Sequence, residues 1–236
     1  MTPTRDVQLS AFPEIQPDKP VGGLLSSVFT GTNADLMKAV APLYLTGSVL
    51  DVTYGEGKWW DRFTPDPFTF HDLHKVDGVS FLDLPEPDAS VDTVCFDPPY
   101  VMSGGESSAA LPDGFQQRYG IGIGRLGQNN AGAFEALLRG GLAETSRVAR
   151  RYLLVKCMEF AQGGGPDGGF KDMPYLMRRW GEDLGLRTHD VIVHATGSGP
   201  GGHNIFTPKR ARRAHSYLLV FAPSPGRALT DLENQP

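Results

Sequence analysis

Apolar runs and segments of helical spacing alternate along most of the chain. Each apolar run is short and is bounded by Gly, Pro or polar residues, which is typical of a buried strand. Six such strands are predicted, at 48–52, 68–72, 91–96, 152–156, 188–194 and 216–221. Strands that alternate with helices are typical of a parallel, doubly wound sheet with helices on both faces. The pattern therefore predicts the α/β class.

Three segments space their apolar residues as one face of a helix would, at 31–41, 133–151 and 174–184. Thr32 fits the N-cap of the first helix, because Asp35 follows three residues later as a capping box requires. No helical pattern separates the last two predicted strands. We therefore expect that these two strands can pair antiparallel at one edge of the sheet.

The chain divides into one large domain and two polar ends. Its 236 residues are 40% hydrophobic, which is enough for a single core. Three glycine-rich stretches are longer than usual connections and are expected to form functional or mobile loops. The expected boundaries are an N-terminal arm at 1–23, a domain at 24–222 with loop insertions at 103–132, 161–169 and 195–213, and a C-terminal tail at 223–236.

Composition argues against several classes of protein. No apolar stretch approaches the roughly 18 residues of a membrane span, and residues 1–16 lack the basic start and apolar run of a secretory signal. Two cysteines are too few for a disulfide framework or a zinc cluster, and the six histidines show no metal-ligand spacing. We therefore expect a cytoplasmic protein that has no membrane partner and no bound metal.

Basic residues are concentrated in the second half of the chain. Although the net charge is −5, residues 1–100 hold 6 Lys and Arg against 15 Asp and Glu, whereas residues 139–227 hold 14 against 7. A basic surface can hold a phosphate backbone whatever the total charge is. The densest basic run predicts a phosphate clamp on nucleic acid, with a solvated turn as the alternative. This run consists of Lys209, Arg210, Arg212 and Arg213.

A glycine turn follows the predicted strand at 48–52, at the sheet edge where open α/β sheets bind their ligands. Gly55 and Gly57 would let a ligand approach the backbone closely. Asp72 ends the next strand, and a carboxylate about 20 residues after the first strand is well placed to hold a pair of ribose hydroxyls. Trp60 stands where a dinucleotide-binding turn has its third glycine. The turn therefore favours an adenosine-containing cofactor without a pyrophosphate.

The predicted strand at 91–96 is followed directly by two prolines and a tyrosine after an aspartate. Two successive prolines force the chain into a rigid, extended turn, because each one fixes φ and lacks a backbone donor. Such a turn presents a carboxylate, a carbonyl and an aromatic ring together, which suits the planar amino group of a nucleobase. The candidate catalytic residues are therefore Asp97, Pro98, Pro99 and Tyr100.

On these motifs the chain resembles the S-adenosylmethionine-dependent amino-methyltransferases of DNA, the adenine-N6 and cytosine-N4 class. The resemblance rests on the glycine turn, on the motif that begins at Asp97, and on a closing segment at 213–221, and it covers most of residues 26–222. It implies a Rossmann-like class I methyltransferase fold, with a mostly parallel seven-stranded sheet and an antiparallel edge strand. Tyr54 replaces the Phe that is usual in the family's cofactor turn.

The resemblance also implies roles for the residues that match the family's cofactor motifs. Asp72 would hold the ribose of S-adenosylmethionine, and Asp83 with Leu82 would lie at its adenine. A segment before the first helix, Phe29 and Thr30, matches the family more loosely. Together, the candidate cofactor residues are Phe29, Thr30, Asp51, Thr53, Tyr54, Gly55, Gly57, Asp72, Leu82 and Asp83.

The implied reaction places a methyl group on an exocyclic amino group of a DNA base, with adenine N6 first and cytosine N4 second. Two acceptors, the Asp97 carboxylate and the Pro98 carbonyl, would localise the lone pair of the amine. A base in duplex DNA has to be flipped to reach them, and Tyr100 would stack on it. The alternatives are an RNA adenine methyltransferase and a non-catalytic partner subunit. Duplex DNA is the expected partner, and a homodimer is left open.

Overall fold

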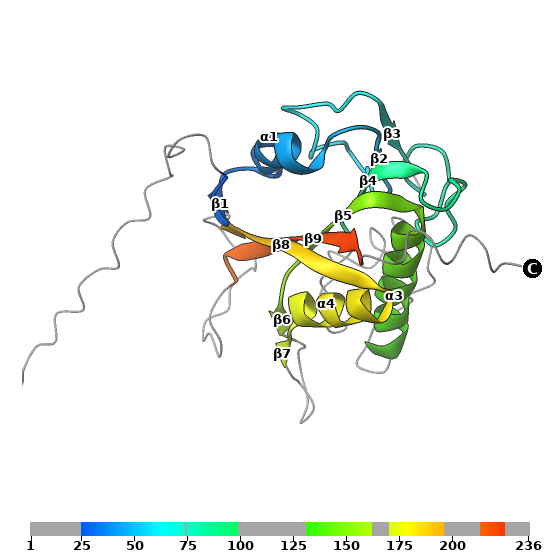
Figure 1. Cartoon of the computed structure of the whole chain (residues 1–236). Coiled ribbons are helices and arrows are strands. Elements are labelled where there is room, and N and C mark those ends of the chain that lie inside the picture. Colours follow the sequence, from blue (N-terminus) through cyan, green and yellow to red (C-terminus); the bar gives the residue numbers. More distant parts are fainter. Residues whose placement is uncertain (1–24, 74, 99–130, 162–169, 196–212, 225–236) are drawn as a thin grey trace, which may run out of the picture.

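The computed structural model describes residues 25–73, 75–98, 131–161, 170–195 and 213–224 (Figure 1). Seven strands form one sheet: β1 (Val28–Thr30), β2 (Val49–Asp51), β3 (Phe68–Phe70), β4 (Val91–Phe96), β5 (Ala149–Cys157), β8 (Leu186–Ala195) and β9 (His215–Pro223). Their order across the sheet is β1-β8-β9-β5-β4-β2-β3. A separate two-stranded ribbon pairs β6 (Phe160–Ala161) with β7 (Phe170–Lys171).

Six of the seven strands run parallel, and β9 runs antiparallel to both of its neighbours, β5 and β8. The expectation of an α/β fold with a mostly parallel seven-stranded sheet is confirmed, with one difference. The antiparallel strand lies inside the sheet, because the short strand β1 pairs with the outer side of β8 and forms the edge. The apolar pattern did not predict a strand at β1.

Helices cover the two faces of the sheet (Figure 1). One face carries α1 (Asn33–Tyr44), whose Leu36 and Val40 share an apolar cluster with Leu154 of β5 and Ile192 of β8. The other face carries α3 (Ala131–Val148) and α4 (Met173–Asp183), and its cluster includes Phe96 at the end of β4. The side chains of the central strands β2, β4, β5 and β9 thus alternate between two separate cores, as the pleat of a strand requires.

The start of α1 follows the predicted capping box. The Thr32 hydroxyl accepts a hydrogen bond from the backbone N–H of Asp35 at 3.1 Å. In return, the Asp35 carboxylate accepts one from the backbone N–H of Thr32 at 3.1 Å. Because β1 runs parallel to the central strands, α1 begins at the edge of the sheet where the central strands end.

Helix α3 holds β4 in place through a close contact at Gly141. A Cβ on Gly141 would lie 2.6 Å from Cζ of Phe96 and 2.9 Å from Cδ2 of Phe81, whereas a Cβ on the neighbouring Gly140 would lie 3.0 Å from the side chain of Leu82. Both phenylalanines are buried, but Leu82 is 42% exposed and can move aside.

We therefore expect Gly141→Ala to lower the melting temperature and Gly140→Ala to leave it unchanged or raise it. An alanine in a helix ordinarily gains up to about 1 kcal/mol over glycine, but overpacking against two buried rings costs roughly 1–3 kcal/mol. Thermal unfolding of the two variants followed by circular dichroism measures the difference. Equal melting temperatures would show that α3 does not press on the end of β4.

Candidate functional site

Four strands end in polar residues on the face that α1 covers. Each of these residues stands two positions after an apolar residue of the α1-side cluster, so the pleat directs it to the same face. The four residues are Asp51 at the end of β2, Asp97 after β4, Lys156 on β5 and His194 on β8. This polar row lies at the carboxyl edge of the sheet, where open α/β sheets bind their ligands.

Asp51 is buried and accepts hydrogen bonds from both sides. Its Oδ2 accepts from Nε1–H of Trp60 at 2.7 Å, and its Oδ1 accepts from the backbone N–H of Thr53 at 2.9 Å. Burial raises the pKa of Asp51 to about 7, although these hydrogen bonds oppose the rise, and the nearby charge of Asp97 adds to it. The charge of Asp51 therefore changes near neutral pH and depends on these surroundings.

Thr53 joins the glycine turn to the candidate catalytic motif. Its hydroxyl oxygen accepts a hydrogen bond from the backbone N–H of Asp97 at 2.8 Å and lies 3.3 Å from Oδ1 of Asp51. The backbone at Asp97, directly after β4, is thus fixed relative to the turn after β2.

The glycine turn has the backbone that its sequence predicts. Gly55 and Gly57 have φ values of 58° and 69°, in the left-handed region that favours glycine. Asp72 supports the turn from below: its Oδ2 accepts from the backbone N–H of Gly55 at 2.8 Å, and its Oδ1 accepts from the backbone N–H of Lys75 at 2.9 Å. These contacts give the Asp72 carboxylate a structural role in the turn, while its expected contact with a ribose stays a prediction.

A cavity of about 150 Å³ lies between the glycine turn and Asp97. It is lined by Asn33, Asp51, Thr53, Tyr54, Glu56, Lys58, Trp59 and Asp97. The fold thus brings four of the predicted site residues, from two different strand ends, around one space.

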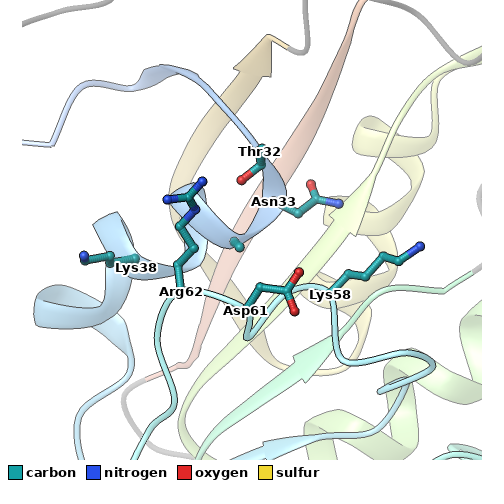
Figure 2. Close-up of a pocket in the computed structure, with 7 residues that line it drawn as sticks. Thr32, Asn33, Lys38, Lys58, Asp61 and Arg62 are labelled. Carbon is teal, nitrogen blue, oxygen red and sulfur yellow. The ribbon is translucent and has the colours of Figure 1, made fainter.

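A second and larger cavity, of about 650 Å³, shares Asn33 and Lys58 with the first. In Figure 2, Asn33 and Lys58 lie on one side of it and Lys38 lies on the other, with Arg62 between them. Several of its charged groups are paired: Arg62 lies 3.0 Å from the Asp35 carboxylate, and Lys58 lies 2.8 Å from that of Glu56. The two cavities are therefore adjacent at Asn33 and Lys58.

Other predicted cofactor residues lie outside both cavities. Leu82 and Asp83 are exposed on the segment after β3, and Thr30 is exposed on β1. Phe29 packs with its ring 6.0 Å from that of His194, at one end of the polar row. The roles expected of these four residues at a cofactor stay predictions.

Part of the predicted acceptor and nucleic-acid site lies outside the described residues. Asp97 and Pro98 are described, and Pro98 is buried, but Pro99 and Tyr100 lie outside the described ranges. The same holds for Lys209, Arg210 and Arg212 of the basic run. Arg213 is described, and its guanidinium carbon lies 5.0 Å from the ring centre of Phe170 on β7. This stacking accounts for the position of Arg213, and its contact with phosphate stays a prediction.

Several residues of this region were not predicted from the sequence. Glu56, Lys58 and Trp59 line the small cavity, and Asn33, Lys156 and His194 form a connected group beside it. Lys156 is 2% exposed, its Nζ contacts Oδ1 of Asn33, and it lies 3.2 Å from Nδ1 of His194. The sequence did contain a signal for Lys156. This lysine interrupts the apolar run Leu153–Cys157, and a charge inside a buried strand is rare.

The remaining chemistry of the described residues is limited. Cys95 and Cys157 are both buried and free, and burial raises the pKa of each thiol. Within the described ranges, no group of three or more His, Cys, Asp or Glu side chains could hold a metal ion. Within the same ranges, none of the helices has the length and apolarity that crossing a membrane would require.

Comparison with protein-family models and with curated proteins finds no match. Among solved structures, the chain is similar to TTHA0409 of Thermus thermophilus, provisionally described as a DNA modification methylase: 17% identity, 60% of this chain covered, TM-score 0.38. This chain spans 50% of the length of that protein. A further structure of TTHA0409 is a complex with S-adenosyl-L-methionine.

Two small-molecule methyltransferases are matched over more of their length. One is the 1,6-didemethyltoxoflavin-N1-methyltransferase of Burkholderia thailandensis, at 10% identity, with 82% of this chain and 79% of that chain covered and a TM-score of 0.44. The other is the magnesium protoporphyrin IX methyltransferase of Synechocystis PCC 6803, at 10% identity, with 81% and 83% covered and a TM-score of 0.43. At these TM-scores the likeness does not identify a substrate for this chain.

His71, which directly precedes Asp72, forms ion pairs with two carboxylates of the segment that follows β3. Nδ1 of His71 lies 2.5 Å from Oδ2 of Asp77, and its Nε2 lies 2.8 Å from Oε1 of Glu86. Burial opposes a charge on this ring, but the hydrogen bonds to Glu86 and Asp77 outweigh it and raise the pKa of His71. His71 therefore favours the imidazolium form in the folded chain.

We expect the stabilisation by His71 to be largest at acid pH. A group whose pKa is raised by folding contributes fully below its unfolded pKa of about 6.5 and loses that contribution as the pH rises through the folded value. The difference in melting temperature between the wild type and His71→Gln should therefore be larger at pH 6 than at pH 9. The exposed His189→Gln is the matched control, and a pH-independent difference for His71→Gln would contradict the ion pairs.

Proposed function

We propose that this chain is an S-adenosylmethionine-dependent methyltransferase that methylates an exocyclic amino group of a DNA base, adenine N6 first and cytosine N4 second. One observation carries the proposal. Asp97 lies directly after a buried strand, hydrogen-bonded through its backbone to the glycine turn, and lines the same cavity as Asp51, Thr53 and Tyr54. The site thus combines a turn that a cofactor can approach with a carboxylate that can accept an N–H hydrogen bond.

The residues of the cavity fit a cofactor that carries a sulfonium and a carboxylate. Asp51 offers negative charge to the sulfonium, whereas Asp97 would face the amine that accepts the methyl group. Lys58 and Asn33, at the wall shared by the two cavities, are suited to the carboxylate of the methionine part. The buried Nε1–H of Trp59 has no hydrogen-bond partner within the described ranges and offers one more donor. A cavity of about 150 Å³ is smaller than whole cofactor sites, so the cofactor would extend into the larger cavity.

When bound, S-adenosylmethionine supplies the electrophilic methyl group. The protein's own contribution is to hold the amine of the base and to make its lone pair available. Asp97 would accept one N–H hydrogen bond and the Pro98 carbonyl the other, which localises the lone pair that is otherwise delocalised into the base. Positioning and electrostatic stabilisation of the developing ammonium would then account for the rate. The methylated nitrogen would lose one proton to the Asp97 carboxylate that accepts its N–H hydrogen bond, and from there to water.

The same residues would serve an RNA adenine methyltransferase, because the acceptor site recognises an amino group and not the sugar. A non-catalytic partner subunit is disfavoured, since both the glycine turn and the aspartate are present and face one cavity. Incubation of the protein with labelled S-adenosylmethionine and either duplex DNA or RNA, followed by nucleoside mass spectrometry, separates these candidates. Methylated adenosine from RNA alone would replace DNA by RNA as the substrate.

We expect Asp97→Asn to abolish transfer and to leave cofactor affinity largely unchanged. The amide keeps the size of the side chain but offers a weaker acceptor, and loss of a preorganised electrostatic contact costs about 100-fold or more in kcat. Calorimetry measures the affinity, and methyl incorporation into DNA measures kcat.

The control for this experiment is Asp66→Asn, which changes an exposed carboxylate next to the start of β3, at the opposite edge of the sheet. It should behave as the wild type in both assays. If Asp97→Asn methylates DNA at the wild-type rate, the acceptor amine does not bind at Asp97.

A further inference from the structure

A buried lysine stands beside the candidate catalytic aspartate. Lys156 is 2% exposed and lies on β5 between Val155 and Cys157, which are also buried. An ammonium group in such a place is costly unless hydrogen bonds and an opposite charge compensate it. Its neighbours supply the hydrogen bonds: Nζ contacts Oδ1 of Asn33 and lies 3.2 Å from Nδ1 of His194.

The orientation of His194 follows from its other nitrogen. Nε2 of His194 lies 2.8 Å from the carbonyl oxygen of Gly31. A carbonyl only accepts, so Nε2 carries the hydrogen and Nδ1 presents a lone pair to Lys156. Burial lowers the pKa of His194, and the charge of Lys156 lowers it further, so the ring stays neutral. Lys156 is therefore the donor in both of its hydrogen bonds.

These hydrogen bonds tie the entry to α1 to the centre of the sheet. Gly31 and Asn33 flank the N-cap of α1, whereas Lys156 and His194 belong to β5 and β8. Asn33 also lines both cavities. The position of the Asn33 amide at the cavity wall thus depends on a lysine that does not itself line the cavity.

Lys156 also lies next to Asp97. The parallel register pairs Phe96 of β4 with Val155 of β5, so the residues that follow, Asp97 and Lys156, are neighbours on the α1 face. Although burial lowers the pKa of Lys156, the negative charge of Asp97 opposes that change. The interaction is mutual, so the ammonium favours an ionised Asp97, whereas the buried carboxylate of Asp51 disfavours it.

We infer that Lys156 is a positioning residue of the methyl-transfer site, which keeps Asp97 ionised beside Asp51 and holds the Asn33 amide at the cavity wall. This inference rests on the proposed function, because it assigns Lys156 a task at the acceptor and cofactor sites. Within the polar row, Asp97 would face the ligand, and the Lys156 ammonium would favour the ionised form of Asp97.

Replacement of Lys156 should shift the pH dependence of the transfer rate in one direction. The groups that face Lys156 are Asp97 from β4, His194 from β8, and Asn33 and the Trp59 ring from the α1 side, with Cys157 next to it in the chain. Removal of the ammonium takes away a positive charge that favours the ionised form of Asp97. Activity that needs an ionised Asp97 is then lost at a higher pH as the solution is acidified.

The test compares four variants of the full chain. In Lys156→Met, we expect the acid limb of the kcat profile to move up by about 1 pH unit, which is about a tenfold loss of rate on that limb. Lys156→Arg retains the charge and should keep the limb in place. Asn33→Ala should weaken S-adenosylmethionine binding without moving the limb. Lys171→Met removes a lysine from β7 and should match the wild type in every assay.

A direct measurement of the Asp97 charge separates the failure of this inference from the failure of the proposed function. Carbon-13 NMR titration of the side-chain carboxyl groups needs neither cofactor nor acceptor, and Asp97→Asn assigns the Asp97 signal. The titration midpoint of Asp97 should rise in Lys156→Met and not in Lys156→Arg. A folded Lys156→Met with an unmoved acid limb and an unmoved Asp97 midpoint overturns the inference, while transfer by the wild type upholds the function. If Lys156→Met does not fold, a displaced limb in Lys156→Arg overturns the inference. If the Asp97 midpoint depends on Lys156 but the wild type transfers no methyl group, the function alone is overturned.

Discussion

The structure depends on compensating charges that the sheet buries at one edge. Asp51, which is buried, and Asp97, which is half-buried, end neighbouring strands on the same face, where their negative charges repel each other. Hydrogen bonds from Trp60 and Thr53 to Asp51 offset part of that cost, and the Lys156 ammonium beside Asp97 offsets another part. The start of α1 and the glycine turn both owe their positions to partners in this row.

Much of the fold could be predicted because its causes are local. A capping box needs only Thr32 and Asp35, and the alternation of strands and helices follows from runs of apolar residues. Strand ends that carry Asp51 and Asp97 could be placed at one edge, because parallel strands all finish on the same side of a sheet. The position of β1 next to β8, at the lateral edge of the sheet, could not be predicted in this way. The strand Val28–Thr30 is too short to show a pattern, and its partner β8 lies more than 150 residues further along the chain.

The parts of the site that escaped prediction all involve long-range pairs. Lys156 meets Asn33 across 123 residues and His194 across 38, so no motif of fixed spacing contains them. Asp72 shows a different limit. Its spacing from the first strand suggested a ribose contact, but the same spacing also places its carboxylate under the backbone N–H of Gly55. Spacing along the chain predicts where a carboxylate lies and does not determine which partner it holds.

The inverted direction of β9 has a consequence for how this protein can change during evolution. Because β8 and β9 are antiparallel neighbours, β8 ends and β9 begins at the edge where Asp51 and Asp97 lie. The connection between them thus leaves and re-enters the sheet on the side of the site. A change in the length of that connection adds or removes residues outside the two strands, on the side of the site. We therefore expect related chains to differ in length there more than at the opposite ends of the strands.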